Sequence, residues 1–359
     1  MLTPKNTPSW RPDQYAKRRD FLELRQRVIR FLRAYFDGKG FAEVDTPVLQ
    51  ISPGNEVHLQ AFRTEWRDPH GGPPQTYYLH TSPEFAMKKL LVAGEPRIYQ
   101  LAHTFRNAEH SNRHHPEFTM LEWYRSGRDE GEEQPLTGII KEDCIKVVRG
   151  AAEAAGRESF TANSMTCDPF QEWESLSVPE AFRRYANIDL LATTPDPYAP
   201  DEKLLRKAIE PLGLRTADDD SWEALFFRVM TEKIEPFLGK DRPTFLGDYP
   251  VSMAALARRK EDDPRLAERF ELYIAGYEIA NAFYELNDAE EQLRRFNADM
   301  DLKEKLYGEC HPIDMDFIEA LRHGMPEAVG IALGVDRLIM LCAGTENIED
   351  VLWLPVASG

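Results

Sequence analysis

The sequence has 359 residues, 42 % of them apolar and 29 % charged, which is enough for one large or two small domains with a buried core. Its formal charge of −17 argues against nucleic acid as the main partner, because phosphate backbones repel a net negative protein that lacks a basic face. The sequence contains neither an apolar run long enough to cross a membrane nor the apolar core of a secretory signal, so we expect no membrane partner.

The four cysteines are scattered along the chain, and none forms a CxxC pair. We therefore expect neither a disulfide framework nor a zinc site, and this cysteine usage fits a reducing cytoplasm best. The four are Cys144, Cys167, Cys310 and Cys342.

The first predicted helix follows a polar arm at residues 1–18, which is rich in proline and arginine. Apolar side chains from Phe21 to Tyr35 recur at steps of three and four residues, which is the spacing of one helix face. Gly38 and Gly40 end this helix.

A strand is predicted at residues 41–50, stopped by Pro47. A second helix then begins at Ser82, Pro83 and Glu84, because a cap residue is followed by proline in the first turn and an acid at the positive end of the helix dipole.

The rest of the chain predicts more strands than helices. The later elements are strands at 97–107 and 117–125, an acidic stretch at 128–135, a helical insertion at about 136–236, an extended segment at 243–250, a hairpin at 269–286 followed by a helix, and a strand at 329–336 that turns into a helix. Hairpins join these strands more often than crossover helices do, so we expect an α+β fold with a mostly antiparallel sheet flanked by helices.

The first hairpin has polar side chains at alternate positions, and such positions share one face of a strand. If the faces of its two strands coincide, they present an arginine suited to a phosphate, an aromatic ring suited to a base, and a carboxylate suited to an ammonium group. On the pattern alone, a polar sheet face with surface ion pairs is the more common explanation. The residues are Gln100, Ala102, Thr104 and Arg106 on the first strand and Phe118, Met120, Glu122 and Tyr124 on the second.

The second hairpin carries two acids. With Ala275-Gly276 as a two-residue turn, Tyr273 lies opposite Glu278, and Glu271 lies diagonal to Glu278 at roughly 7–8 Å between Cα atoms. Such a pair can hold Mg²⁺ ions that carry nucleotide phosphates, although two solvated surface acids are the more common case.

Two further polar residues of this hairpin, Asn281 and Glu285, have the opposite parity to Glu278. For all three to face one site, a bulge is needed between about Ile279 and Ala282. Near the C-terminus, Gly334 lies where a predicted strand bends into a helix, which allows a ligand to approach the backbone, and Arg337 at that bend can reach a phosphate. A tight packing turn explains that bend equally well.

Taken together and in this order, the segments resemble the three signature motifs of class II aminoacyl-tRNA synthetases. KGFAEVDTPVLQ is similar to motif 1, FRNAEHSNRHHPEFTMLEWYR to motif 2 and GIALGVDRLIML to motif 3. TSPEFAMKKLL, LARRKEDDP and YEIANAFYELNDAEEQ resemble lysyl-tRNA synthetase in particular. The resemblance covers the chain from about residue 18, and it implies the class II synthetase catalytic fold, ATP and Mg²⁺ as cofactors, and a homodimer through motif 1.

Within this class, the chain resembles the elongation factor P lysine ligase family, truncated paralogues of lysyl-tRNA synthetase. The segments before motif 1 and after motif 3 are too short for an anticodon-binding domain, so residues 19–359 are expected to form one catalytic domain. That family activates (R)-β-lysine with ATP and joins it to a lysine of elongation factor P. Ala332 favours this family, because lysyl-tRNA synthetase has glycine there. Whether the substrate is α- or β-lysine stays open.

The resemblance also implies residue roles. Arg106 and Arg337 are expected to hold the nucleotide phosphates and to stabilise the reacting charge, Phe118 to stack on adenine, and Glu271 and Glu278 to hold Mg²⁺. The other residues expected to bind ATP are Asn107, Ala108, Glu109, His114, His115, Ile279 and Gly334. Those expected to bind the amino acid are Ser82, Pro83, Glu84, Glu122, Tyr124, Asn281, Glu285 and Ala332.

One position departs from the family pattern. Motif 2 commonly reads Arg-x-Glu, but Ala108 occupies the glutamate position and Glu109 follows it. Either Glu109 substitutes after a shift of the loop, or ATP is held with one contact fewer. A tRNA-charging enzyme and a non-catalytic regulatory paralogue remain as alternatives. The missing anticodon-binding domain and the net charge disfavour the first, and the retained ATP and metal residues disfavour the second.

Overall fold

The computed structural model describes residues 8–127 and 134–356. Residues 1–7 of the expected arm and most of the acidic stretch at 128–135 therefore lie outside the described residues. Within them, the α-helices are α1 (Pro12–Gly38), α2 (Glu84–Val92), α3 (Leu136–Ala155), α4 (Val178–Ala181), α5 (Glu202–Ile209), α6 (Trp222–Val229), α7 (Ala289–Tyr307), α8 (Met315–Gly324) and α9 (Val335–Ala343). None of these helices is long and apolar enough to cross a membrane.

The strands of the same residues are β1 (Ala42–Glu43), β2 (Leu49–Gln50), β3 (Arg63–Trp66), β4 (Gln75–Leu79), β5 (Arg97–Phe105), β6 (Glu117–Ser126), β7 (Phe160–Ala162), β8 (Met165–Cys167), β9 (Glu174–Ser177), β10 (Thr244–Pro250), β11 (Leu266–Ile274), β12 (Tyr277–Tyr284) and β13 (Ala328–Gly334). Short 3-10 and π turns lie at η1 (Phe182–Ala186), η2 (Leu191–Thr193), η3 (Glu210–Leu212), η4 (Met230–Ile234), η5 (Glu235–Phe237), η6 (Val251–Met253) and η7 (Ile348–Val351).

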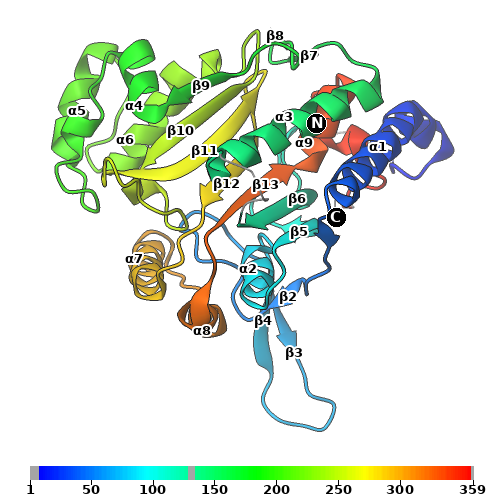
Figure 1. The fold of residues 1–359 in the computed structure, drawn as a ribbon, viewed down its shortest axis with the longest axis horizontal. Helices are drawn as coiled ribbons and strands as arrows, with labels where there is room; N and C mark the ends of the chain where they lie inside the picture. The colour runs from blue at the N-terminus through cyan, green and yellow to red at the C-terminus, as the bar shows by residue number, and fades with distance from the viewer. Residues whose placement is uncertain (1–7, 128–133, 357–359) are drawn as a thin grey trace, which may run out of the picture.

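An eight-stranded sheet forms the centre of the molecule, in the order β1-β5-β6-β13-β12-β11-β10-β9. Its two outermost pairs, β1–β5 and β10–β9, are parallel, and the pairs between them are antiparallel. The expected α+β fold with a mostly antiparallel sheet is therefore confirmed. Strands β2, β4 and β3 form a separate small sheet that projects from the body (Figure 1).

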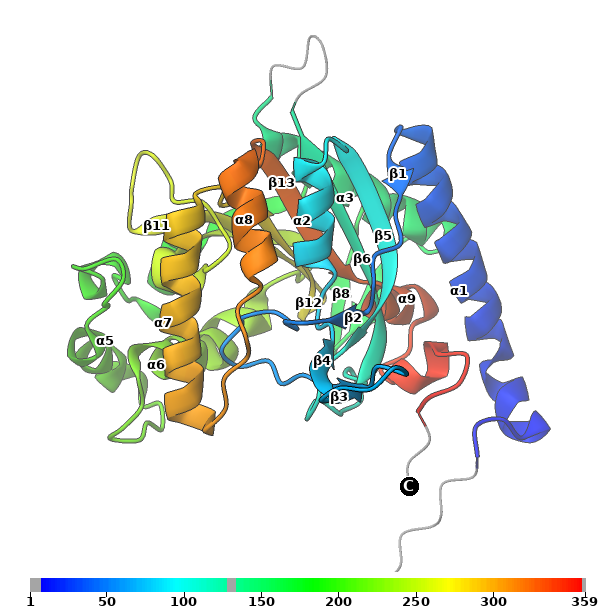
Figure 2. The same ribbon diagram turned by 90° about the horizontal axis from the view of Figure 1, so that it is seen from below.

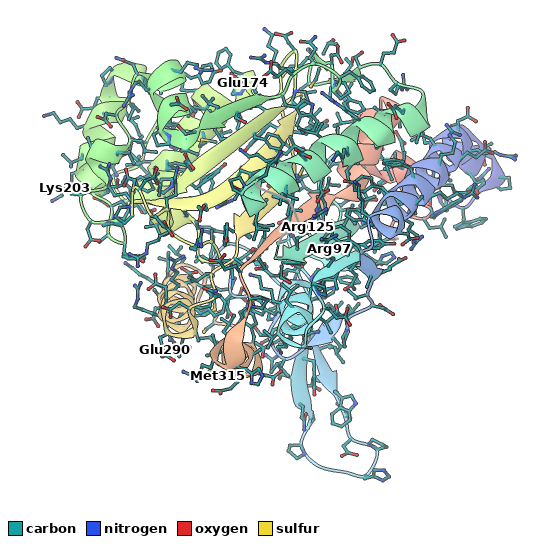
Figure 3. All side chains as sticks on the ribbon, in the orientation of Figure 1. Arg97, Arg125, Glu174, Lys203, Glu290 and Met315 are labelled. Carbon is teal, nitrogen blue, oxygen red and sulfur yellow. The ribbon has the colours of Figure 1, made fainter. Side chains whose placement is uncertain are left out.

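Helices cover both faces of the central sheet. On one face, α1, α3 and α9 pack into the largest apolar core, and Arg125 of β6 reaches α3, where its Nε lies 2.8 Å from Asp143 Oδ2 (Figure 3). On the other side, α2, α7 and α8 meet around Phe85, Phe296 and Phe317, as the view from below shows (Figure 2). This second side carries the residues expected to bind ligands.

Three segments differ from the predicted elements. Helix α1 begins at Pro12, inside the stretch expected as an arm, because proline in the first turn lacks only an amide that the helix leaves unpaired. Residues 41–50 form not one strand but β1 and β2 in different sheets, on either side of Pro47. Residues 136–236 are not purely helical, since β9 joins the edge of the central sheet.

The hairpin of β11 and β12 has the predicted register. Ala275 and Gly276 both have positive φ, at 49° and 74°, and Tyr273 pairs with Glu278. The expected bulge is also present: Leu272 pairs with Ala280, so Ile279 is the extra residue. Glu278 and Asn281 consequently point to the same face.

Candidate functional site

One row of side chains crosses five strands on the face with α2 and α7. Gln100 pairs with Glu122, Glu122 with Ala332, Ala332 with Asn281, and Asn281 with Glu271. Residues that are paired across a sheet point to the same face. The two hairpins and β13 therefore converge on one surface, as the sequence required, and the methyl group of Ala332 lies between the strands that carry Glu122 and Asn281.

On one side of this row, further along the strands, cationic side chains gather around the strand-to-helix bend of β13 and α9. The Arg106 guanidinium lies over the Phe118 ring, 5.2 Å from its centroid, which places a phosphate-binding group beside a stacking platform. Arg337 donates from Nη1 to the carbonyl of Glu278 at 2.9 Å and from Nε to that of Arg113 at 3.4 Å. We call Arg106, Arg113 and Arg337 the guanidinium cluster.

The pKa of His114 reflects the positive charge of the guanidinium cluster. Burial and the positive charges of Arg337, Arg113 and Arg106 lower the pKa of His114 to about 4. The imidazole is therefore held neutral and adds no further positive charge to the mutually repelling arginines. The cluster is therefore a region of positive potential that a polyanion such as a nucleotide triphosphate would neutralise.

The structure separates the two adjacent histidines of motif 2. His115 is buried, and its Nδ1 lies 2.5 Å from the carbonyl of Glu117 while its Nε2 accepts from the amide of Val356 at 3.1 Å. Both ring nitrogens are thus used by the backbone. In this structure the side chain fastens the C-terminal segment to β6, and the role of His115 in ATP binding stays a prediction.

The departure at Ala108 has a local consequence. Ala108 adopts a left-handed conformation, with φ of 61°, and turns the chain so that the carboxylate of Glu109 lies 3.9 Å from the Arg106 guanidinium. Asn107 fastens this turn, since its amide donates to the carbonyl of Gln60 at 2.8 Å. The geometry fits the alternative in which Glu109 takes the place of the motif 2 glutamate.

Two acids lie beside the guanidinium cluster. Surrounding protein atoms and the charge of Glu271 raise the pKa of Glu278 to about 7, although its side chain stays accessible to solvent. Glu271 already has partners: Arg269 Nη2 lies 2.5 Å from Oε1, and the hydroxyls of Tyr249 and Tyr273 donate to Oε2 at 2.5 and 2.7 Å.

This acid pair fits Mg²⁺ that is also held by nucleotide phosphates. A cation would relieve the repulsion that raises the Glu278 pKa, and Mg²⁺ at phosphates needs only one or two protein carboxylates. The described residues contain no group of three or more side chains suited to a metal. Glu278 is the available ligand, and Glu271 could join it only by exchanging one of its present partners.

On the opposite side of the row from the guanidinium cluster, three acids form a buried group. We call Glu84 of α2, Glu122 of β6 and Glu285, which directly follows β12, the carboxylate cluster. Glu122 is 0 % exposed, and Ser82 and Tyr124 donate hydroxyl hydrogen bonds to it at 2.5 and 3.0 Å. Burial and the charge of Glu84 raise the pKa of Glu122 to about 8.

Gly330 lets two members of this region approach each other. A Cβ atom there would lie 2.2 Å from Cε1 of Tyr124 and 2.3 Å from Oε1 of Glu285. Oε1 has no hydrogen-bond partner among the described residues, so it is a buried acceptor without a donor. Such an atom suits the ammonium group of a ligand.

A small cavity adjoins the carboxylate cluster. The segment from Gln50 to Glu56 borders it on one side and Ser82–Ala86 on the other. The expected residues Ser82, Pro83 and Glu84 therefore line a cavity, and Pro83 is buried at the start of α2.

Three residues of the site were not predicted. Arg269 neutralises Glu271 and donates from Nε to Asn281 at 3.1 Å, and Glu56 borders the cavity close enough to Arg106 and Glu84 for their charges to affect its pKa. Lys88 is completely buried against the carboxylate cluster. The parity of Arg269 with Glu271 and the four-residue step from Glu84 to Lys88 were the available signals.

Comparison with known proteins agrees with this geometry. A family model described as class II tRNA synthetases (D, K and N) matches residues 13–358. A Yersinia enterocolitica protein is 39 % identical over 352 residues, 98 % of each chain, and a Haemophilus ducreyi protein is 38 % identical over 328 residues, 91 % of each. A Yersinia pestis protein is 36 % identical over 353 residues, again 98 % of each. All three are named elongation factor P–(R)-β-lysine ligase.

Proposed function

We propose a function from one premise: the chain belongs to the class II tRNA synthetase family of the D, K and N type, and its relatives over nearly the whole length are elongation factor P–(R)-β-lysine ligases. It is an ATP-dependent ligase that activates a lysine-type amino acid, (R)-β-lysine in our proposal, and transfers it to a lysine side chain of elongation factor P. The observation that carries this proposal is that the guanidinium cluster and the carboxylate cluster lie on opposite sides of one row of paired residues on a single face of the sheet.

The first step forms the adenylate. A carboxylate oxygen of the amino acid attacks the α-phosphorus of ATP, and the bond to pyrophosphate breaks. Arg106 and Arg337 hold the phosphates and stabilise the charge that develops on them, while Phe118 stacks on adenine. Asn107, Glu109, His114, Ile279 and Gly334 border the same nucleotide. Mg²⁺, held by Glu278 with Glu271 nearby, would supply charge neutralisation of the phosphates.

In the second step, an amine nitrogen of the acceptor attacks the carbonyl carbon of the adenylate. AMP leaves as the amide bond forms, and the amine gives up a proton. No protein nucleophile takes part. Glu84, Glu122 and Glu285 hold the two ammonium groups of the substrate, with Ser82, Tyr124, Asn281 and Ala332 shaping the space between them.

Incubation with ATP, each lysine isomer and purified elongation factor P tests this function, with intact mass as the readout. We expect a gain of one lysyl residue with (R)-β-lysine and a smaller yield with α-lysine. Elongation factor P whose acceptor lysine is replaced by arginine is the control. Aminoacylation of lysine-specific tRNA without any gain of mass on elongation factor P would instead make the chain a tRNA-charging enzyme.

Three coarser properties belong to the same proposal. The free cysteines fit a reducing compartment, so we place the enzyme in the cytoplasm. The resemblance of residues 39–50 to motif 1 supports a homodimer. Residues 19–359 are proposed to act as one catalytic unit.

A further inference from the structure

Lys88 is the one lysine in direct contact with the carboxylate cluster among the residues that the structure describes. Its Nζ pairs with Glu84 and lies 2.5 Å from Oε2 of Glu285, and the whole side chain is 0 % exposed. Glu84 and Lys88 are one helical turn apart on α2, so the helix fixes the lysine at the acid four residues before it. Glu285 approaches from the central sheet.

The net charge of the pocket follows from the number of its acids and the single lysine that pairs with them. The three acids of the carboxylate cluster carry three negative charges when a bound diamine keeps them all ionised, and Lys88 cancels one of them. The further acid at the cavity, Glu56, lies within the influence of the positive charge of Arg106. The two remaining negative charges of the cluster match the two ammonium groups of a lysine-type amino acid, whose own carboxylate must face ATP. Buried charges are tolerated only when they are paired, so this count decides which ligands can enter.

The ion pairs of Lys88 involve only one carboxylate oxygen of each of its two acidic partners. Lys88 contacts Oε1 of Glu84 and Oε2 of Glu285. Oε1 of Glu285, which lies beside Tyr124 and Gly330, stays without a hydrogen-bond donor. Lys88 thus leaves one side of Glu285 available to a ligand.

Building on the proposed function, we infer that Lys88 is a positioning residue that sets the pocket's charge at two negative charges and thereby makes the enzyme selective for a substrate with two ammonium groups. It neither contacts the reacting atoms nor binds the nucleotide. Its contribution is to hold Glu84 and Glu285 together, which would otherwise repel each other, and to exclude a third cation from the pocket.

Charge counting gives a test by ATP–pyrophosphate exchange with α-lysine, (R)-β-lysine and the monoamine norleucine. Lys88→Met keeps an unbranched side chain up to the position of Cε and removes the charged terminal nitrogen, and we expect kcat/KM for the lysines to fall at least about 100-fold. In Lys88→Met/Glu285→Gln the pocket again carries two negative charges, and we expect at least about a 10-fold recovery over Lys88→Met, chiefly in KM.

Glu285→Gln alone keeps Lys88 and leaves a single negative charge. We expect its preference for lysine over norleucine to fall at least about 10-fold, and this result stays informative if Lys88→Met does not fold. Lys89→Met is the matched control, because the neighbouring lysine on α2 pairs with Asp314 and Asp316 outside the cluster and should not change selectivity.

The outcomes separate the two proposals. If wild-type protein exchanges pyrophosphate with neither lysine isomer, the proposed function is wrong. If wild type is active but the double variant is no better than Lys88→Met and Glu285→Gln keeps the wild-type preference, the charge role of Lys88 is wrong and the lysine is only structural.

Discussion

Each end of the site brings like charges together, but the two ends differ in burial and in counter-ions. The guanidinium cluster has uncompensated positive charge, lies partly open to solvent, and lowers the pKa of His114 to about 4. The carboxylate cluster is buried, contains its own counter-ion in Lys88, and raises the pKa of Glu122 to about 8. At both ends like charges repel each other, and a bound substrate group of opposite charge reduces that repulsion. Only the buried end, however, constrains the number of charges that a ligand must bring.

This difference assigns distinct tasks to the two ends. An open cluster of arginines attracts any polyphosphate, and its strength lies in placing charge where the transition state develops it. A buried cluster rejects any ligand that leaves one of its acids unpaired. We therefore expect variants at the guanidinium cluster to lose rate for all amino acids, and variants at the carboxylate cluster to lose selectivity.

The largest effect is expected at the guanidinium end. Arg337→Ala removes a donor aimed at the nucleotide, and the rate of pyrophosphate exchange should fall by about 10²–10³-fold or more for both lysine isomers. Arg322→Ala, which loses only exposed pairs with Glu290 and Glu319, is the control and should retain activity. Normal exchange in Arg337→Ala would remove this residue from the site, and an altered dimer in that variant would point to a structural role instead.

The second-largest effect is expected at the buried end, beside the carboxylate cluster. Gly330→Ala would place a methyl group within 2.3 Å of both Tyr124 and Glu285, so one of them must move. Overpacking of this kind costs about 1–3 kcal/mol, which predicts an increase of about 10–100-fold in KM for lysine while ATP affinity stays unchanged. Calorimetric titration with each ligand separates the two affinities.

Gly247→Ala is the matched control for that substitution. Gly247 also lies in the central sheet, but a Cβ atom there would meet its neighbours at 3.6 Å, an ordinary contact. A loss of ATP affinity equal to the loss of lysine affinity in Gly330→Ala would show that the two ends of the site are not independent.

Sequence patterns predicted the open end better than the buried one. Alternation within β6 predicted which face of the sheet carries Phe118. The two-residue turn at Ala275-Gly276 predicted the pairing of β11 with β12, and with it the face that carries Glu271 and Glu278. The bulge at Ile279 was also predictable, since polar residues of opposite parity had to share a face.

The partners that neutralise these groups could not be predicted in the same way. Lys88 meets Glu285, and Arg25 of α1 donates to Asp336 of α9 and to Thr119 at 2.8 Å, across separations in sequence that no local pattern encodes. The same holds for His115, whose partner Val356 lies 241 residues away. Tertiary packing, rather than the motif, therefore decides the surroundings of the two adjacent histidines.

The third prediction uses the raised pKa of Glu122. A carboxyl whose pKa is higher in the folded state than in the unfolded chain contributes stability at low pH that is lost as the pH rises from about 4.5 to about 8. Glu122→Gln cannot ionise, so its free energy of unfolding relative to wild type should increase over this range, by on the order of 2 kcal/mol.

Thermal unfolding of both proteins at several pH values measures this difference, and Glu117→Gln on the same strand, with an exposed side chain, is the control. Saturating lysine should reduce the difference, because an ammonium group stabilises the ionised carboxylate. A constant difference between wild type and Glu122→Gln across the range would mean that Glu122 is already ionised in the empty pocket.

The smallest effect is expected at Ala332, which lies between the two ends and carries no charge. Its methyl group is flanked by Glu122 and Asn281 in the sheet, so it can shape the space next to the amino group that distinguishes α- from β-lysine. A single methyl group discriminates by about 1–3 kcal/mol at most, and Ala332→Gly should therefore improve α-lysine relative to (R)-β-lysine by about 5–10-fold without slowing exchange. The ratio of kcat/KM for the two isomers is the measurement. An unchanged ratio would place this methyl group outside the substrate's reach and leave isomer selection to the geometry of the carboxylate cluster.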